Sequence, residues 1–442
     1  MVVVSLVIGI GIFRTPAIVA KDTGSPEMFF LAWLTGGFIC LIGGLTFAEI
    51  GARKPFAGGF YKVVSEAYHP AFAFMINWLG VIITVSATFA AVAFIASEYL
   101  IKSIGDFIPF INYQSLSSEN GIKITASIIT FFLFFINYIG IKSGSRLLNF
   151  ITVLKIAIIL IFAVSAFFTS SPNKVSTSTV TSNANFISAL FGFFIGLRAV
   201  FFTVGGYQLT TNLAADVIEP KRNLPKAIIT GVIAVIALYL LINIGYYKLL
   251  GFNGIANSNL IAADMADIIF GSAGSKIISM AIFISAAGFL NATILYIPRT
   301  YHAMAEDCII PAIFKKVNLK TQVQEFVLIF MFILILFFTF TLGKFDSVLN
   351  VIMFNDSLVI AVTASTLFIF RYRSSKDKIQ FDGFKTPFYP ILPAIFILFL
   401  LIVSFFSFKE DLLSGLLSLL VLSLSFPLFF IFRYINKKRL PN

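Results

Sequence analysis

Apolar runs of about 20 residues recur along the whole chain, and this recurrence restricts the fold more than any other feature of the sequence. A helix of that length crosses the hydrocarbon layer of a bilayer, which is roughly 30 Å thick. Charged residues make up only 12% of the 442 residues, whereas hydrophobic residues make up 59%. A soluble domain with so few charges would lack the polar groups needed to cover its surface. The sequence therefore predicts a single all-α polytopic membrane domain, embedded in the lipid bilayer, over residues 1–442.

We predict twelve transmembrane helices, of which the first and sixth are interrupted by glycines. Gly9 and Gly11 interrupt the first, and Gly205 and Gly206 interrupt the sixth. Because apolar residues follow Met1 directly, we expect the true start of the protein to lie upstream or to have been assigned late. The twelve spans are predicted at 1–20, 28–49, 71–101, 122–140, 146–169, 187–213, 226–250, 275–303, 325–343, 346–371, 388–408 and 412–434.

The lysines and arginines predict the orientation of the chain. With the N-terminus in the cytoplasm, 21 of the 32 basic residues fall on the cytoplasmic side and nine on the outer side. Such an excess is typical of cytoplasmic loops, so both termini are predicted to be cytoplasmic. It also accounts for the net charge of +12 without a nucleic-acid partner. Abundant Phe, Ile and Lys indicate an AT-rich bacterial genome, which makes the bacterial inner (plasma) membrane the expected location.

The glycine interruptions predict a binding site. An unwound backbone within a membrane must find partners for its N–H and C=O groups, so it is tolerated mainly where it lines a cavity. Two interruptions five spans apart are the pattern of inverted five-helix repeats with a substrate site between them. Free N–H groups suit a carboxylate and free carbonyls suit an ammonium group, so the site is suited to an amino acid. The alternative is that these glycines only allow close helix packing.

Four stretches of the sequence carry a resemblance to a known family. With them in this order, the chain resembles the L-type amino-acid transporter-like permeases of the amino acid–polyamine–organocation (APC) superfamily. The stretches are IGIGIFRTP (8–16), FAEIGARKPFAGGFYKVVSEAY (47–68), VGGYQLTTNLAADVIEPKRNLPKAI (204–228) and PRTYHAMAEDCIIPAIF (298–314).

The resemblance implies a LeuT-like fold of two inverted five-helix repeats, at 1–170 and 187–371, plus two C-terminal helices at 388–434. Ile10, Arg14 and Tyr207 depart from the residues common at these positions in the family, and the first two leave the side-chain preference of the site open. The substrate-binding residues implied are Ile8, Gly9, Ile10, Gly11, Ile12, Phe13, Phe202, Thr203, Val204, Gly205, Gly206 and Tyr207.

Lys155 lies in the middle of the fifth span, and a charged residue there is a functional candidate by default. It matches a lysine of sodium-independent family members, whose ammonium group resembles a stand-in for a bound sodium ion. We expect Lys155 to bridge the first interruption to the eighth span, near Ser285, and it could also carry a coupling proton. The alternative is a lysine that reaches the inner interface.

Five further charged residues are candidates for gates or vestibules: Arg14, Arg198, Glu49, Asp216 and Arg299. Arg14 and Arg198 lie outward of the two interruptions and could line an outer vestibule or pair with Glu98. Glu49 and Asp216 lie at the cytoplasmic ends of their spans, where Arg53, Arg222 or Arg299 could pair with them as inner-gate contacts. Interfacial charges without a specific role are common, so this alternative stays open.

Other functional classes find little support in the sequence. It contains no G-x-x-x-x-G-K-[ST] loop for an ATP-driven pump and no H-E-x-x-H or G-x-S-x-G motif for a membrane enzyme. A channel would need a continuous polar lumen or a filter built by symmetry. Neither cofactor nor metal is expected, and no enzymatic activity. The loop before the fourth span lacks the cysteine with which animal relatives bind a heavy chain, so we expect no such partner and a monomer or weak homo-oligomer.

The sequence thus predicts a sodium-independent secondary active transporter for amino acids, working as a proton symporter or an exchanger. Two alternatives remain: a transporter of polyamines or other amines, and an amino-acid sensor that does not transport.

Overall fold

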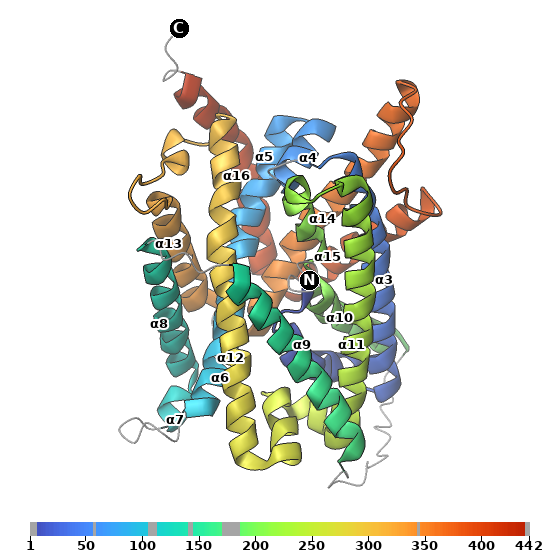
Figure 1. Cartoon of the computed structure of the whole chain (residues 1–442), viewed down its shortest axis with the longest axis vertical. Coiled ribbons are helices and arrows are strands. Elements are labelled where there is room, and N and C mark those ends of the chain that lie inside the picture. Colours follow the sequence, from blue (N-terminus) through green and yellow to red (C-terminus); the bar gives the residue numbers. More distant parts are fainter. Residues whose placement is uncertain are drawn as a thin grey trace.

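The computed structural model describes residues 7–55, 59–104, 113–139, 145–169, 186–342 and 345–437, and these residues form helices and connecting loops without a β-strand. Most of the long helices run side by side along the long axis of the molecule (Figure 1). The helical order is η1 (Gly11–Phe13), α2 (Thr15–Thr23), α3 (Pro26–Arg53), α4 (Gly59–Ala67), α5 (Pro70–Leu79), η2 (Gly80–Val85), α6 (Ser86–Ile104), α7 (Tyr113–Leu116), α8 (Glu119–Tyr138), α9 (Ser145–Phe168), α10 (Phe186–Val204), η4 (Tyr207–Asp216), α11 (Pro220–Asn257), α12 (Ile261–Glu306), η5 (Ala312–Lys315), α13 (Glu325–Leu342), α14 (Phe345–Lys376), α15 (Ile391–Glu410) and α16 (Leu412–Lys437).

Nine helical stretches within the described ranges are long and apolar enough to cross a membrane. They correspond to nine of the twelve predicted spans. Of the other three, the fifth and ninth contain the shorter apolar helices Ile156–Phe168 and Glu325–Thr341, and the first is broken. The polytopic helical fold is confirmed, while the count of twelve remains a prediction.

Two of the long helices extend beyond the predicted spans. α11 continues past Gly251 and α12 begins before Gly271, and both glycines adopt positive φ, at 67° and 70°. A glycine tolerates this backbone conformation at no steric cost, so the helix axis bends there. The predicted span 226–250 ends close to the first bend, and the span 275–303 begins close to the second. Short helical segments join the two at one end of the molecule, near the foot of α11 and α12 (Figure 1).

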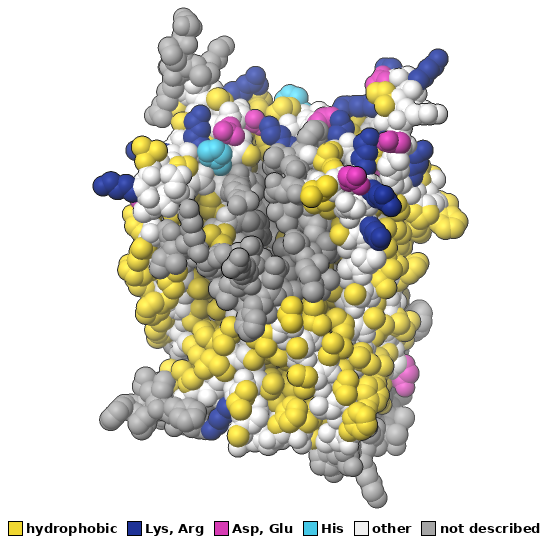
Figure 2. Space-filling model, in the orientation of Figure 1, with side chains coloured by type: hydrophobic (Ala, Val, Ile, Leu, Met, Phe, Trp, Pro, Cys, Tyr) yellow, Lys and Arg dark blue, Asp and Glu magenta, His cyan; other side chains and the backbone are white. Residues whose placement is uncertain are grey.

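Apolar side chains cover the flank of the molecule, whereas lysines and arginines gather at one end (Figure 2). The basic end is also where α4 lies and α16 ends (Figure 1). Among the exposed apolar side chains are Phe131, Ile277, Phe337 and Leu413. Such a large contiguous apolar surface would be unstable in water and is what a lipid-facing belt requires.

α3 forms the centre of the packing around the two interrupted segments. It lies against α10 and α11, while α12 lies against α6 and α9. Its glycines permit the close approach: a Cβ atom added to Gly36 would lie 2.5 Å from a methyl carbon of Val200 on α10. Small residues of this kind let membrane helices pack at short distance, where dispersion forces hold them.

Gly36→Ala should therefore destabilise the protein, since the new methyl group overlaps the stiff side chain of Val200. Overpacking of this type costs about 1–3 kcal/mol. The thermal unfolding midpoint in detergent measures the effect. Gly44→Ala on the same helix is the matched control, because its Cβ would meet its nearest neighbour, Val232, at an ordinary 3.4 Å. Equal midpoints for the two variants would contradict the prediction.

Candidate functional site

The first interruption lies between Ile8 and Ile10. Val7 is helical, residues 8–10 are not, and a short 3₁₀ turn, η1, follows before α2 begins at Thr15. Pro16 in the first turn of α2 lacks an N–H and has a φ angle already suited to a helix, so it favours a new helix start here. The predicted break in the first span is thus present in the structure.

The second interruption separates α10 from η4 at Gly205 and Gly206. Gly206 has φ of +106°, a value that a residue with a side chain rarely adopts. Its N–H donates to the side-chain oxygen of Gln208 at 2.9 Å, while the N–H of Gly205 still donates to the Phe201 carbonyl. The chain therefore leaves the helix at Gly206, also as predicted.

The two interruptions lie against each other. The hydroxyl groups of Thr15 and Thr203 are 2.5 Å apart, and a Cβ atom on Gly11 would lie 3.1 Å from the Thr203 side chain. Tyr99 on α6 donates a hydrogen bond of 2.8 Å to the Phe13 carbonyl. Segments separated by nearly 190 residues in the sequence are thereby brought into direct contact.

A cavity of about 150 Å³ lies where the interruptions meet. An engineered protein cavity of roughly this size holds a benzene molecule, so the space is suited to a small solute. Both interruptions contribute to the wall, together with residues of η2, α6, α12 and α14. The lining residues are Val7, Gly9, Ile10, Gly11, Thr84, Val85, Thr88, Val92, Ile95, Phe201, Phe202, Thr203, Gly205, Gly206, Gln208, Leu209, Phe289, Thr293, Ile352, Met353 and Asp356.

The predicted binding residues divide into two groups. Those that line the cavity are Gly9, Ile10, Gly11, Phe202, Thr203, Gly205 and Gly206, and those that do not are Ile8, Ile12, Phe13, Val204 and Tyr207. Ile8, Ile12, Phe13, Val204 and Tyr207 are buried by neighbouring helices instead. The Tyr207 ring, for example, packs edge-on against Phe47 of α3. The role of all twelve residues in substrate binding stays a prediction.

Several polar lining residues were missed by the sequence reasoning: Thr84, Thr88, Gln208, Thr293 and Asp356. The threonines and the glutamine carry no local signal that separates them from ordinary membrane residues. Asp356 does carry one, because it is an acidic residue in the middle of a predicted span. The criterion that selected Lys155 and Arg198 would have selected it too.

Two arginines pair with carboxylates on the side of the cavity away from the basic end. Arg14 lies 3.5 Å from Glu98 of α6, as the sequence suggested, and also donates to the Asn259 carbonyl. Arg198 lies 3.9 Å from Asp22 and donates to the Asn350 side chain on α14. The two arginines therefore connect the segments next to both interruptions to α6 and α14. Their role in gating stays a prediction.

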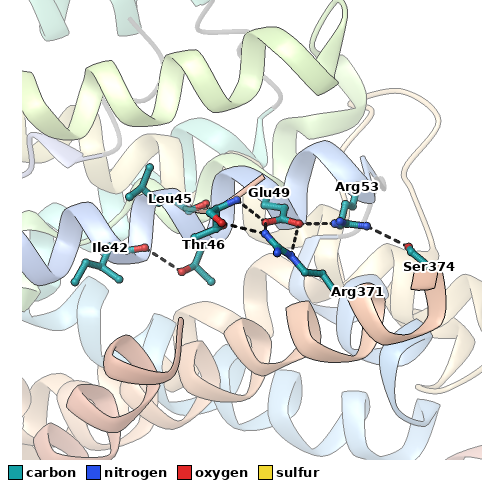
Figure 3. Close-up of polar contacts among 8 residues, drawn as sticks. Ile42, Leu45, Thr46, Glu49, Arg53, Arg371 and Ser374 are labelled. Atoms are coloured by element: carbon teal, nitrogen blue, oxygen red, sulfur yellow. Dashed lines mark hydrogen bonds and ion pairs between the residues drawn. The ribbon is translucent and has the colours of Figure 1, made fainter. Parts of the chain in front are cut away.

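Glu49 forms the densest polar network of the described residues, near the basic end (Figure 3). Its fully buried carboxylate accepts hydrogen bonds from Arg53 at 2.6 Å and from Arg371 at 2.6 and 2.9 Å. The Thr386 N–H adds a further bond of 2.7 Å. The partner Arg53 was anticipated, whereas Arg371 was not. This network joins α3 to α14 and to the loop that precedes α15.

The side chains of Lys155, Asp216 and Arg299 lie outside the described part of the structure. The predicted partner of Lys155, Ser285 of α12, is described. Its hydroxyl group is fully buried and has no hydrogen-bond partner among the described residues. α12 packs against α9, the helix that carries Lys155.

Broken helices around a central cavity, within a lipid-exposed bundle, define the class of membrane transport proteins. The chain matches the amino acid permease family over residues 1–421 and belongs to that family, within the APC superfamily. The resemblance found in the sequence is thereby confirmed.

The curated relatives are transporters of amino acids. The serine/threonine exchanger SteT of Bacillus subtilis is 28% identical over 406 residues, covering 89% of this chain and 86% of its own. The human large neutral amino acids transporter small subunit 2 is 23% identical, covering 99% of this chain and 79% of its own. The human cystine/glutamate transporter is also 23% identical, with 99% and 84% covered.

Glu49→Gln should strongly destabilise the protein, because it leaves two partly buried guanidinium groups facing a fully buried neutral amide. Removing one partner of a buried ion pair typically costs about 3–5 kcal/mol. We expect a large drop in the thermal unfolding midpoint in detergent. Asp382→Asn is the control, since it removes an exposed carboxylate 2.8 Å from Lys221 and should leave the midpoint unchanged. If both variants melt with the parent, the network does not stabilise the fold.

Proposed function

We propose that the protein is a sodium-independent secondary active transporter that moves amino acids across the membrane by alternating access, as a proton symporter or an exchanger. The observation that carries this proposal is the cavity at the contact between the two interruptions. It is the one place where unwound backbone from two distant segments lines a common solute-sized space in the described structure. Membership of the permease family and the amino-acid exchange activity of a relative agree with it.

The interruptions supply the chemistry that an amino acid requires. Backbone N–H groups at the start of a helical segment attract a carboxylate, and carbonyl groups at the end of one attract an ammonium group. Gly9 to Gly11 and Thr203 to Gly206 are the segments that we assign to these roles. Glycine at these positions keeps the main chain accessible, since a side chain would fill part of the cavity.

Alternating access requires two arrangements of the helices around a fixed site. We assign residues 1–170 and 187–371 to two inverted repeats that move against each other, and residues 388–434 to two additional helices. The arginine pairs of Arg14 and Arg198 would open and close the outer side, and the Glu49 network the inner side. Asp216 and Arg299 remain candidates for further inner contacts.

The basic end is assigned to the cytoplasm, with both chain termini there. The gathering of lysines and arginines at this end supports the assignment, because cytoplasmic segments carry an excess of positive charge. We place the protein in a bacterial inner membrane, as the similarity to a Bacillus subtilis exchanger favours. We also propose that it works without a disulfide-linked heavy chain.

Flux measurements with purified protein in liposomes test the proposal. Uptake of radiolabelled amino acids would be measured without sodium, with and without unlabelled amino acid inside, at two external pH values. Uptake that needs internal amino acid identifies an exchanger, and uptake into empty vesicles driven by an inward proton gradient identifies a symporter. Amino-acid binding without flux would identify a sensor, and flux of polyamines alone an amine transporter; either result would overturn the proposal.

Lys155 is expected to replace a sodium ion between the first interruption and Ser285, whose buried hydroxyl group has no hydrogen-bond partner among the described residues and so supports this assignment. Uptake by the parent protein should not respond to sodium. Lys155→Ala should lower uptake at least tenfold in the absence of sodium, corresponding to about 1.4 kcal/mol. Adding sodium should restore part of that uptake.

Lys123→Ala is the matched control, since Lys123 pairs with Glu119 on the same helical face at the start of α8. It should transport like the parent. Strict dependence of the parent on sodium would refute the role assigned to Lys155.

A further inference from the structure

Asp356 is the acidic residue on the wall of the central cavity. It lies on α14, is partly buried, and shares its helical face with the lining residues Ile352 and Met353. Residues three and four positions apart present their side chains toward the same side of a helix. The carboxylate therefore belongs to the same space as both interruptions.

The preceding residue points elsewhere. The side-chain amide of Asn355 is fully buried and donates to the Val351 carbonyl at 2.7 Å and to the Ser418 hydroxyl of α16 at 3.0 Å. It is thereby engaged in helix packing, and Asp356 is left to face the cavity. Asn355 and Asp356 thus lie on different faces of α14.

No counter-charge accompanies Asp356 in the part of the chain that is described. Its carboxylate forms no hydrogen bond or ion pair with a described residue, and no lysine or arginine lines the cavity. The other polar lining side chains are neutral hydroxyl or amide groups. The described lining also includes no residue of α9, the helix that carries Lys155.

An ionised carboxylate without a partner inside a membrane protein is costly, and such groups typically pair or line a substrate pathway. The main chain at the two interruptions can hydrogen-bond the carboxylate and ammonium groups of an amino acid, whose opposite charges cancel. One negative charge then remains in the site. A substrate with an additional positive charge would complete the electrostatic balance.

We propose that Asp356 determines substrate specificity by pairing with a cationic side chain, so that the transported amino acids include diamino acids and related cationic ones. This inference rests on the proposed transport of amino acids. The cavity of about 150 Å³ favours the shorter members of the class, because each further methylene group must also be accommodated. The carboxylate acts on the substrate directly and needs no cofactor.

Transport of matched substrate pairs in proteoliposomes tests the inference. Ornithine and norleucine have side chains of equal length, ending in an ammonium and a methyl group respectively, and arginine and citrulline form a second pair. We expect the parent to transport ornithine with a higher kcat/KM than norleucine. Asp356→Asn should lower this ratio at least tenfold while norleucine transport persists, which also shows that the variant is folded.

Two further variants sharpen the experiment. Asp382→Asn removes an exposed carboxylate far from the cavity lining and should leave the ornithine to norleucine ratio unchanged. Asp356→Glu keeps the charge but extends it into the cavity, so it should retain the preference for a cation and shift it toward 2,4-diaminobutyrate. If Asp356→Asn does not fold, this shift carries the test, and its absence would refute the inference.

The possible failures are distinguishable. Uptake of norleucine by the parent without uptake of, or competition by, ornithine and arginine would overturn the inference and leave amino-acid transport intact. So would an Asp356→Asn variant that loses only its response to a proton gradient, which would make Asp356 a proton site. Transport of putrescine alone, or no flux at all, would overturn the proposed function and the inference with it.

Discussion

Every backbone N–H and C=O group in the bilayer must find a partner, and the structure depends on how this protein meets that constraint. Nearly everywhere it does so with continuous helices. At Gly9 and at Gly206 it departs from helical geometry, and both departures occur in the interior of the bundle, where protein rather than lipid surrounds them. Unwound backbone at membrane depth is tolerated only where protein buries it or where it lines a cavity. The cavity at their contact is therefore a consequence of the same constraint that builds the helices.

Charged side chains on the two sides of the cavity form ion pairs, whereas the one on its wall forms none with a described residue. On its two sides arginines and carboxylates pair with one another, so their charges are balanced within the protein. The fully buried Glu49 illustrates the balance, with two arginines and one backbone N–H around a single carboxylate. Asp356, on the cavity wall, has no hydrogen-bond or ion-pair partner among the described residues. Paired charges connect helices, whereas an unpaired one in a cavity is available to a solute.

The helix breaks depend on local sequence and were predicted, whereas several contacts between distant segments were not. The breaks were predicted from the glycines at 9, 11, 205 and 206, because the backbone preferences of glycine act on its own residue. The Arg14–Glu98 pair was suggested by position along the membrane, and it is present. The pairing of Glu49 with Arg371 was not anticipated, since 322 residues separate them. Of the residues around the breaks, Phe13 and Tyr207 are buried without lining the cavity, and the Tyr207 ring packs against Phe47 of α3.

The sequence alone is enough to identify this chain as a helical membrane protein of the amino acid permease family and to predict where its helices are interrupted. Hydropathy, glycine placement and motif order are properties of short segments, so they can be read without knowing which helices meet. Which side chains share the central space became clear from the three-dimensional structure, because it depends on the rotation of each helix about its axis. A rotation of one residue, about 100°, separates Asn355, which packs against α16, from Asp356, which faces the cavity.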